Sequence, residues 1–280
     1  MNATLFRRFC SIAMEKAGLN MKPGKEALVA ARVARRIRAL ELDSPAAYLD
    51  YLESEKTGKE MVLFLDAITT NFTHFFREQP HFDYLSRWTR GRVAAGERKL
   101  RIWSAAASTG EEPYSIAMTL LDAVEHQNVD VRILATDLST QALQVAREGA
   151  YSRDRLKPVP PSQRARYFDE RFKGQTDADT SWVVRPEVRE MLVFARLNLS
   201  RPPFPMQGPF DIVFCRNVMI YFPENVRRRL VHEIERLLRP GGVLMIGHTE
   251  TLGGLNSSLK RCQPAIYAKP LEPGGHRDPY

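Results

Sequence analysis

The stretch Arg101–Ala117, RIWSAAASTGEEPYSIA, decides how this chain folds. Its first residues predict a short apolar strand, Ala105–Gly110 predicts a turn of small residues, and Pro113 lies where a helix begins. A strand, a tight turn and a helix in this order form the entrance to a nucleotide-type site in an open α/β sheet. The stretch therefore predicts a parallel α/β fold with a ligand at this turn, and an ordinary ligand-free turn is the alternative interpretation.

The residues of this turn indicate which kind of ligand it accepts. Small side chains let the backbone approach a ligand closely, and Gly110 can adopt the positive φ of a sharp turn. The GxxxxGK[ST] run of phosphate-binding loops is missing, and Glu111 and Glu112 place two negative charges beside the turn. These features favour a neutral or cationic ligand over a phosphate.

From Leu100 onward, apolar strands alternate with helices, which is typical of a parallel sheet. The last of these strands is expected to pair antiparallel at the sheet edge. Residues 155–188 interrupt the alternation with prolines and a polar stretch, and we predict an inserted antiparallel β subdomain there. The strands predicted after the first are 131–136, 191–196, 210–215, 243–246 and 265–268.

Polar residues follow several of these strands. Asp137 ends the second strand about 27 residues after Gly110, where an acidic side chain can accept both hydroxyls of a ribose. Asn198-Leu199 and Arg216-Asn217 follow two later strands. Because the carboxyl ends of parallel strands meet at one edge, these groups together favour a pocket for a purine nucleoside.

Residues 1–70 read as a separate helical domain, and 71–98 as a linker with a connecting helix before a main domain at 99–270. Residues 1–40 hold nine Lys/Arg against two Glu, a local net charge of +7. Such an excess indicates either an acidic partner or a solvated helix face, and we favour a docking surface. The candidate docking residues are Lys25, Arg32, Arg35, Arg36 and Arg38.

Five blocks of sequence resemble the CheR-type chemotaxis receptor methyltransferases. The blocks are TTNFTHFFRE (69–78), WSAAASTGEEPYSIA (103–117), ILATDLS (133–139), ARLNL (195–199) and FDIVFCRNVMIYF (210–222). The resemblance implies a Rossmann-like, seven-stranded sheet that binds S-adenosylmethionine and releases S-adenosylhomocysteine. It also implies the cofactor site, which comprises Asn71, Thr73, Arg77, Glu111, Asp137, Asn198, Leu199, Arg216 and Asn217.

The resemblance further implies the reaction, which is methyl esterification of glutamate side chains on acidic receptor helices. A glutamate of pKa about 4.3 is already ionised at neutral pH, so the enzyme needs in-line placement more than acid–base help. Arg77 and Tyr221 are the candidates for holding the carboxylate. Some relatives grip a receptor's C-terminal peptide with a Gly-x-Gly loop, but Phe172–Trp182 has only Gly174, so we do not expect that tether.

The composition narrows the remaining possibilities. Three cysteines and six histidines are scattered through the sequence, which predicts reduced thiols, a cytoplasmic protein and no metal site. We expect no membrane insertion and a flexible tail at 271–280. An RNA methyltransferase and a non-catalytic cofactor-binding adaptor remain as alternatives, although the basic helix lacks the aromatic residues that stack on nucleic-acid bases.

Overall fold

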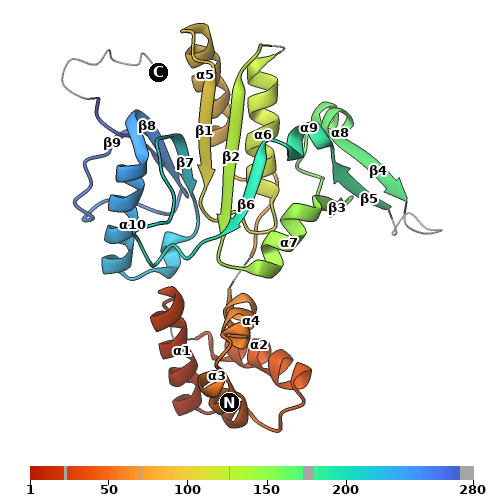
Figure 1. Ribbon diagram of the computed structural model, residues 1–280, viewed down its shortest axis with the longest axis vertical. Coiled ribbons are helices and arrows are strands. Elements are labelled where there is room, and N and C mark those ends of the chain that lie inside the picture. The colour runs from red at the N-terminus through yellow and green to blue at the C-terminus, as the bar shows by residue number, and fades with distance from the viewer. Residues whose placement is uncertain (22–23, 70, 126, 173–179, 272–280) are drawn as a thin grey trace.

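A computed structural model describes residues 1–21, 24–69, 71–125, 127–172 and 180–271. Four helices at the N-terminus lie against one end of a larger α/β domain (Figure 1). The expected tail and the stretch that contains Gly174 fall outside the described residues. In the described part of the chain, every helix is too short or too polar to cross a membrane.

The N-terminal helices are α1 (Ala3–Ala17), α2 (Glu26–Ala39), α3 (Pro45–Ser54) and α4 (Lys59–Ile68). The side chain of Asn2 caps α1 and that of Ser44 caps α3, each accepting a hydrogen bond from a backbone N–H of the first turn. Buried rings hold the helices together, with the Phe9 centroid 5.9 Å from Tyr48 and 5.7 Å from Phe64. These contacts give the helical part its own small core.

The central sheet has seven strands in the order β6-β2-β1-β7-β8-β10-β9. Strands β6 (Leu192–Arg196), β2 (Asp130–Asp137), β1 (Lys99–Ser104), β7 (Phe210–Cys215) and β8 (Leu238–Ile246) are parallel neighbours. This arrangement confirms the predicted Rossmann-like class. Strand β10 (Ile266–Ala268) is antiparallel to β8 as expected, but it is not at the edge, because β9 (Lys260–Gln263) pairs on its outer side.

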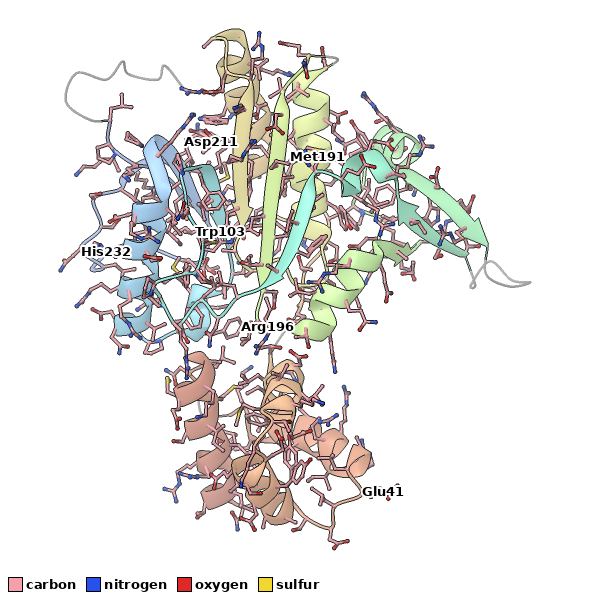
Figure 2. All side chains as sticks on the ribbon, in the orientation of Figure 1. Glu41, Trp103, Met191, Arg196, Asp211 and His232 are labelled. Atoms are coloured by element: carbon pink, nitrogen blue, oxygen red, sulfur yellow. The ribbon has the colours of Figure 1, made fainter. Side chains whose placement is uncertain are left out.

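Helices cover both faces of this sheet, and Trp103 lies at its centre (Figure 2). The Trp103 ring contacts Phe204 and Phe210, at centroid distances of 5.7 Å and 5.8 Å, and its Nε1 donates to Thr136 Oγ1 at 2.9 Å. So large a buried ring with its polar atom satisfied suits the position of β1, the middle one of the five parallel strands. The surrounding helices are α5 (Pro80–Ala94), α6 (Glu111–Val124), α7 (Thr140–Glu148) and α10 (Glu224–Leu237).

The predicted insertion forms a three-stranded antiparallel sheet in the order β3-β5-β4. Its strands are β3 (Ala150–Ser152), β4 (Phe168–Phe172) and β5 (Thr180–Val184), with short helices α8 (Pro161–Tyr167) and α9 (Pro186–Arg189) beside them. This small sheet projects from the side of the main domain, at the end of α7 (Figure 1). The inserted β subdomain is therefore confirmed.

The N-terminal helices cover the carboxyl ends of the parallel strands. Figure 2 shows Arg196, the last residue of β6, at the helical end of the sheet and Met191, which precedes β6, at the opposite end. Hydrogen bonds join the two parts: Asn198 Nδ2 donates to the carbonyl of Lys16 at 2.8 Å, and the backbone N–H of Asn20 donates to the carbonyl of Tyr221 at 2.8 Å. The edge where ligands bind in such sheets is thus roofed by α1 and α2.

Candidate functional site

A cavity of about 520 Å³ lies between the strand ends and the N-terminal helices. Its size falls within the roughly 300–1,000 Å³ that is usual for sites of small molecules and cofactors. It brings together nearly all of the residues predicted for the site. Those on its wall are Lys25, Arg32, Asn71, Thr73, Arg77, Asp137, Asn198, Leu199, Arg216, Asn217 and Tyr221.

Asp137 ends β2 and holds the glycine turn in place. Its Oδ2 accepts a hydrogen bond from Ser108 N and its Oδ1 one from Ser139 N, each at 2.8 Å. Burial raises the pKa of Asp137 above its usual value, against the lowering effect of these backbone donors. Each carboxylate oxygen keeps a second lone pair, so the side chain can still accept the hydroxyls of a ribose.

Gly110 has a φ of 99°, as the sharp turn requires. A Cβ atom at this position would lie 2.6 Å from the hydroxyl of Tyr151 and 3.0 Å from the backbone of Ala146. The glycine is therefore needed both for the conformation and for the close packing of α7 against the turn.

Of the two adjacent glutamates, the structure brings Glu112 and not Glu111 to the cavity. The Glu111 carboxylate is buried and turned away, where it pairs with Arg155 at 2.7 Å and accepts from Thr109 Oγ1 at 2.7 Å. Contact between Glu111 and a ligand stays a prediction, and the structure adds Glu112 as a second candidate. Glu112 accepts from Ser104 Oγ at 2.7 Å, and burial raises its pKa.

Arg216 is a buried residue of the cavity wall that holds neighbouring segments together. Its guanidinium pairs with Glu78 at 3.0 Å and with Glu112 at 3.3 Å, and also donates to the carbonyl of Arg77. Burial alone would raise the pKa of Glu78, but the Arg216 charge outweighs that effect and holds the pKa below its usual value. Arg216 therefore positions the 77–78 segment and Glu112, and most of its donors are already used.

The two predicted asparagines also have partners within the protein. Asn198 uses its Nδ2 on Lys16, and its Oδ1 accepts from the backbone N–H and hydroxyl of Ser200, at 3.0 Å and 2.8 Å. Asn217 has a φ of 57°, and its backbone N–H donates to Glu250 Oε2 at 2.8 Å. Asn198 thus joins the two parts of the molecule, and Asn217 presents its amide at a fixed turn beside the cavity.

Arg77 and Tyr221 both line the cavity, on segments that are distant in the sequence. Arg77 lies in the loop before α5 and donates to the carbonyl of Phe72 at 3.3 Å. Tyr221 ends a short 3₁₀ helix, Met219–Tyr221, whose position is fixed by the hydrogen bond from Asn20. A cation and a phenol therefore meet at one opening.

The five basic residues predicted for docking do not act as one surface. Arg36 forms a two-pronged pair with the buried Glu60, at 2.9 Å and 2.7 Å, and so belongs to the core of the helical part. Arg32 donates to the carbonyls of Ile68 and Thr69 at the cavity wall. Lys25, Arg35 and Arg38 remain exposed, and Lys25 also reaches the cavity.

Three exposed apolar side chains on the cavity lining were missed by the sequence reasoning. Phe72 is 74% exposed, Ile220 46% and Leu28 39%. They come from three segments that are distant in the sequence, so no local pattern could have placed them together. Exposed apolar side chains on the lining of a cavity are suited to a ligand that is partly covered by a second macromolecule.

Fold and cavity together define an S-adenosylmethionine-dependent methyltransferase. Residues 4–69 match the family description "CheR methyltransferase, all-alpha domain", and residues 71–268 match "CheR methyltransferase, SAM binding domain". The chain belongs to the CheR methyltransferase family.

Relatives from several bacteria agree with this assignment. The chain is 39% identical to a chemotaxis protein methyltransferase of Salmonella typhimurium, over 94% of this chain and 89% of the relative. It is 39% identical to one of Escherichia coli, over 94% and 90%, and 36% identical to one of Borreliella burgdorferi, over 94% and 93%. Among solved structures, an S-adenosylmethionine-dependent methyltransferase of Mesorhizobium loti aligns at 18% identity with a TM-score of 0.31, over 59% of this chain and 54% of that one, too weak a likeness to carry a conclusion.

Proposed function

We propose that this protein methylates the side-chain carboxylates of glutamates on chemotaxis receptor helices, giving glutamate methyl esters and S-adenosylhomocysteine. The proposal rests on the relatives, which are named chemotaxis protein methyltransferases and align with this chain over nearly their full length. The observation that carries it for this chain is that Arg77, Tyr221, Arg32 of α2 and Lys25, the residue before α2, all line one cavity.

The cavity residues fit S-adenosylmethionine as the methyl donor. We assign Asp137 to the ribose hydroxyls, Leu199 to the adenine, and Asn71, Thr73 and Asn217 to the methionine end. Glu112 takes the place first given to Glu111, because its carboxylate lies on the wall. When bound, the cofactor supplies a methyl group on a positively charged sulfur, which suits a wall that carries two carboxylates.

The protein's own contribution is to place the acceptor carboxylate and to keep water away. Arg77 is the cation that holds the carboxylate, and Tyr221 donates a hydrogen bond to it from the other side of the opening. A carboxylate needs no deprotonation at neutral pH, so neither residue has to act as a base. Placement of two reactants at contact distance is the main source of rate enhancement in such a site.

The opening also fits an amphipathic, acidic helix. Apolar contacts come from the exposed side chains of Phe72, Ile220 and Leu28. Positive charge comes from Arg35 and Arg38 of α2 and from Lys25 just before it, all of which are exposed to solvent. A helix that presents apolar residues on one face and acidic residues beside them complements both features. The cysteines at 10, 215 and 262 are free, which agrees with a reaction in the cytoplasm.

The test is transfer of radiolabelled methyl groups from S-adenosylmethionine to receptor-rich membranes. We expect label on protein that alkali releases as methanol, and Tyr221→Phe should slow its appearance while the affinity for S-adenosylhomocysteine stays unchanged. Alkali-stable label on RNA would assign the activity to nucleic acid. Tight cofactor binding without any transfer would instead show a binding adaptor, and either result would refute the proposal.

A further inference from the structure

Three side chains from distant parts of the sequence meet behind the cavity wall. Glu78 precedes α5, His81 lies in the first turn of α5, and His248 follows β8. The Glu78 Oε2 atom lies 3.5 Å from His81 Nδ1 and 3.9 Å from His248 Nε2, and the three atoms all lie within 4.8 Å of one another. The fold therefore brings His81 and His248 close together, although they are far apart in the sequence.

His81 is buried in an unusual way. Its side chain is 0% exposed, and neither ring nitrogen has a hydrogen-bond partner among the described residues. Buried polar atoms are nearly always paired, so an unpaired imidazole requires an explanation. Both ring nitrogens are therefore free of hydrogen bonds within the described structure, and one of them can serve a ligand.

The charges around this cluster can accept a cation. Arg216 is surrounded by the carboxylates of Glu78 and Glu112, and Glu250 lies close by, accepting from the backbone N–H groups of Asn217 and Gly247. Negative groups thus outnumber the one buried guanidinium. Glu78 Oε2 has two lone pairs, so it can face the imidazoles while it accepts from Arg216.

We propose that Glu78, His81 and His248 form a binding site for a divalent transition metal ion, with Zn²⁺ as the best fit. Two imidazole nitrogens and one carboxylate oxygen are a ligand set that Zn²⁺ favours, with water in the fourth position. Bonds of about 2.0–2.2 Å in tetrahedral geometry place ligand atoms roughly 3.4 Å apart, so the Glu78–His81 separation of 3.5 Å already fits, and the exposed His248, now 3.9 Å from Glu78, has to move closer to the ion. His248 is 43% exposed and gives the ion a path from solvent.

The site would act on the methyltransferase centre through Glu78. The same carboxylate oxygen that faces the imidazoles also accepts from Arg216, whose guanidinium donates to the carbonyl of Arg77. Binding of an ion to Glu78 would therefore affect the hydrogen bonds from Arg216 that position residues 77–78. Metal occupancy and the arrangement of Arg77 are coupled for this reason.

The test is Zn²⁺ titration of the full-length protein by calorimetry, with Co²⁺ absorption as a second readout of tetrahedral coordination. His248→Ala should weaken Zn²⁺ binding by at least the roughly 10–100-fold that even lost ligand-supporting contacts cost. The matched control is His232→Ala on α10, because His232 is also exposed and lies 4.0 Å from a carboxylate, that of Glu235. This control should bind Zn²⁺ as the parent protein does.

Further variants make the outcome independent of folding defects. Glu78→Gln should also lose affinity, and a thermal melt of each variant without metal reports whether the fold is kept. Absence of Zn²⁺ binding at micromolar concentration, or equal affinity of His248→Ala and the parent, would overturn the proposal. Loss of binding in Cys262→Ser instead would assign the ion to that exposed thiol and would overturn it as well. Since metal affinity is measured directly, the result does not depend on the methyl acceptor.

Discussion

Arg35 and Arg36 are neighbours on α2, but we expect their substitution by alanine to have different consequences. Arg36 Nη2 lies 2.7 Å from Glu60 Oε2, and Arg36 Nε lies 2.9 Å from Oε1. Glu60 is only 4% exposed, and the buried hydroxyl of Tyr48 donates to it at 2.7 Å. Arg36→Ala would leave this carboxylate buried with the Tyr48 hydroxyl but no cation.

The size of the effect follows from this geometry. Breaking a buried ion pair by removing one partner costs about 3–5 kcal/mol. The Arg36 side chain is 18% exposed and Tyr48 still donates, so we take a lower value of about 2–3 kcal/mol. At roughly 2–4 °C per kcal/mol for a chain of this size, the melting temperature should fall by about 5–10 °C.

Differential scanning calorimetry of the full chain measures this change, with Arg35→Ala as the control. Arg35 is exposed, so its substitution should alter stability by no more than about 0.5 kcal/mol. In the methylation assay, Arg35→Glu should reduce the rate on receptor membranes and leave cofactor affinity unchanged. Equal melting temperatures for Arg36→Ala and Arg35→Ala would refute the structural role that we assign to Arg36.

The remaining predictions concern the cavity and its support. Asp137→Asn should weaken binding of S-adenosylhomocysteine by about tenfold or more, the value of one charge-assisted hydrogen bond, and unchanged affinity by calorimetry would remove Asp137 from the site. Glu112→Gln should weaken the same binding more than Glu111→Gln does, and the reverse order would contradict the assignment of the cavity wall. Asp66 accepts from the first N–H groups of α7, so Asp66→Ala should lower stability by about 1 kcal/mol, measured by urea unfolding. Burial raises the pKa of Glu111 in the folded state, so the folded protein holds this proton more tightly than the unfolded chain does. The stability that this group contributes therefore falls as the pH rises above the usual pKa of glutamate. Glu111→Gln should flatten that dependence of the unfolding free energy on pH, measured from pH 4.5 to 7.

The parts of the fold that the sequence predicts are those set by local chemistry. The strand, small-residue turn and helix of Arg101–Ala117 are decided by adjacent residues, and the turn fixes where the parallel sheet begins. The position of Asp137 follows from the same logic, because strand length determines where a strand-end residue lies. The edge strand β9 was not predicted, because all four of its residues are exposed and do not alternate between buried and exposed positions. Its position depends on pairing with β10.

Where the structure departs from the sequence-based assignments, the reason is how helices rotate in three dimensions. Glu111 and Glu112 are adjacent in the first turn of α6, and which of them faces the cavity is set by how α6 packs on the sheet. The same holds for Arg35 and Arg36, which lie about 100° apart around α2. Glu60, which forms the ion pair with Arg36, lies on α4. The charge pattern of α2 alone could therefore not distinguish a docking arginine from an arginine of the core.

The bonds between the two parts explain why docking and chemistry can be coupled. Asp66 of α4 caps α7, Asn198 holds the end of α1, and Asn20 holds the carbonyl of Tyr221. Each bond joins the N-terminal part to a segment that carries a cavity residue or leads directly to one. Under the proposed function, a receptor helix that contacts α2 would therefore be held at a fixed distance from Arg77 and Tyr221. The proposed reaction needs mainly a carboxylate at contact distance, so we expect the N-terminal helices to contribute to the active site and not to serve as a separate adaptor.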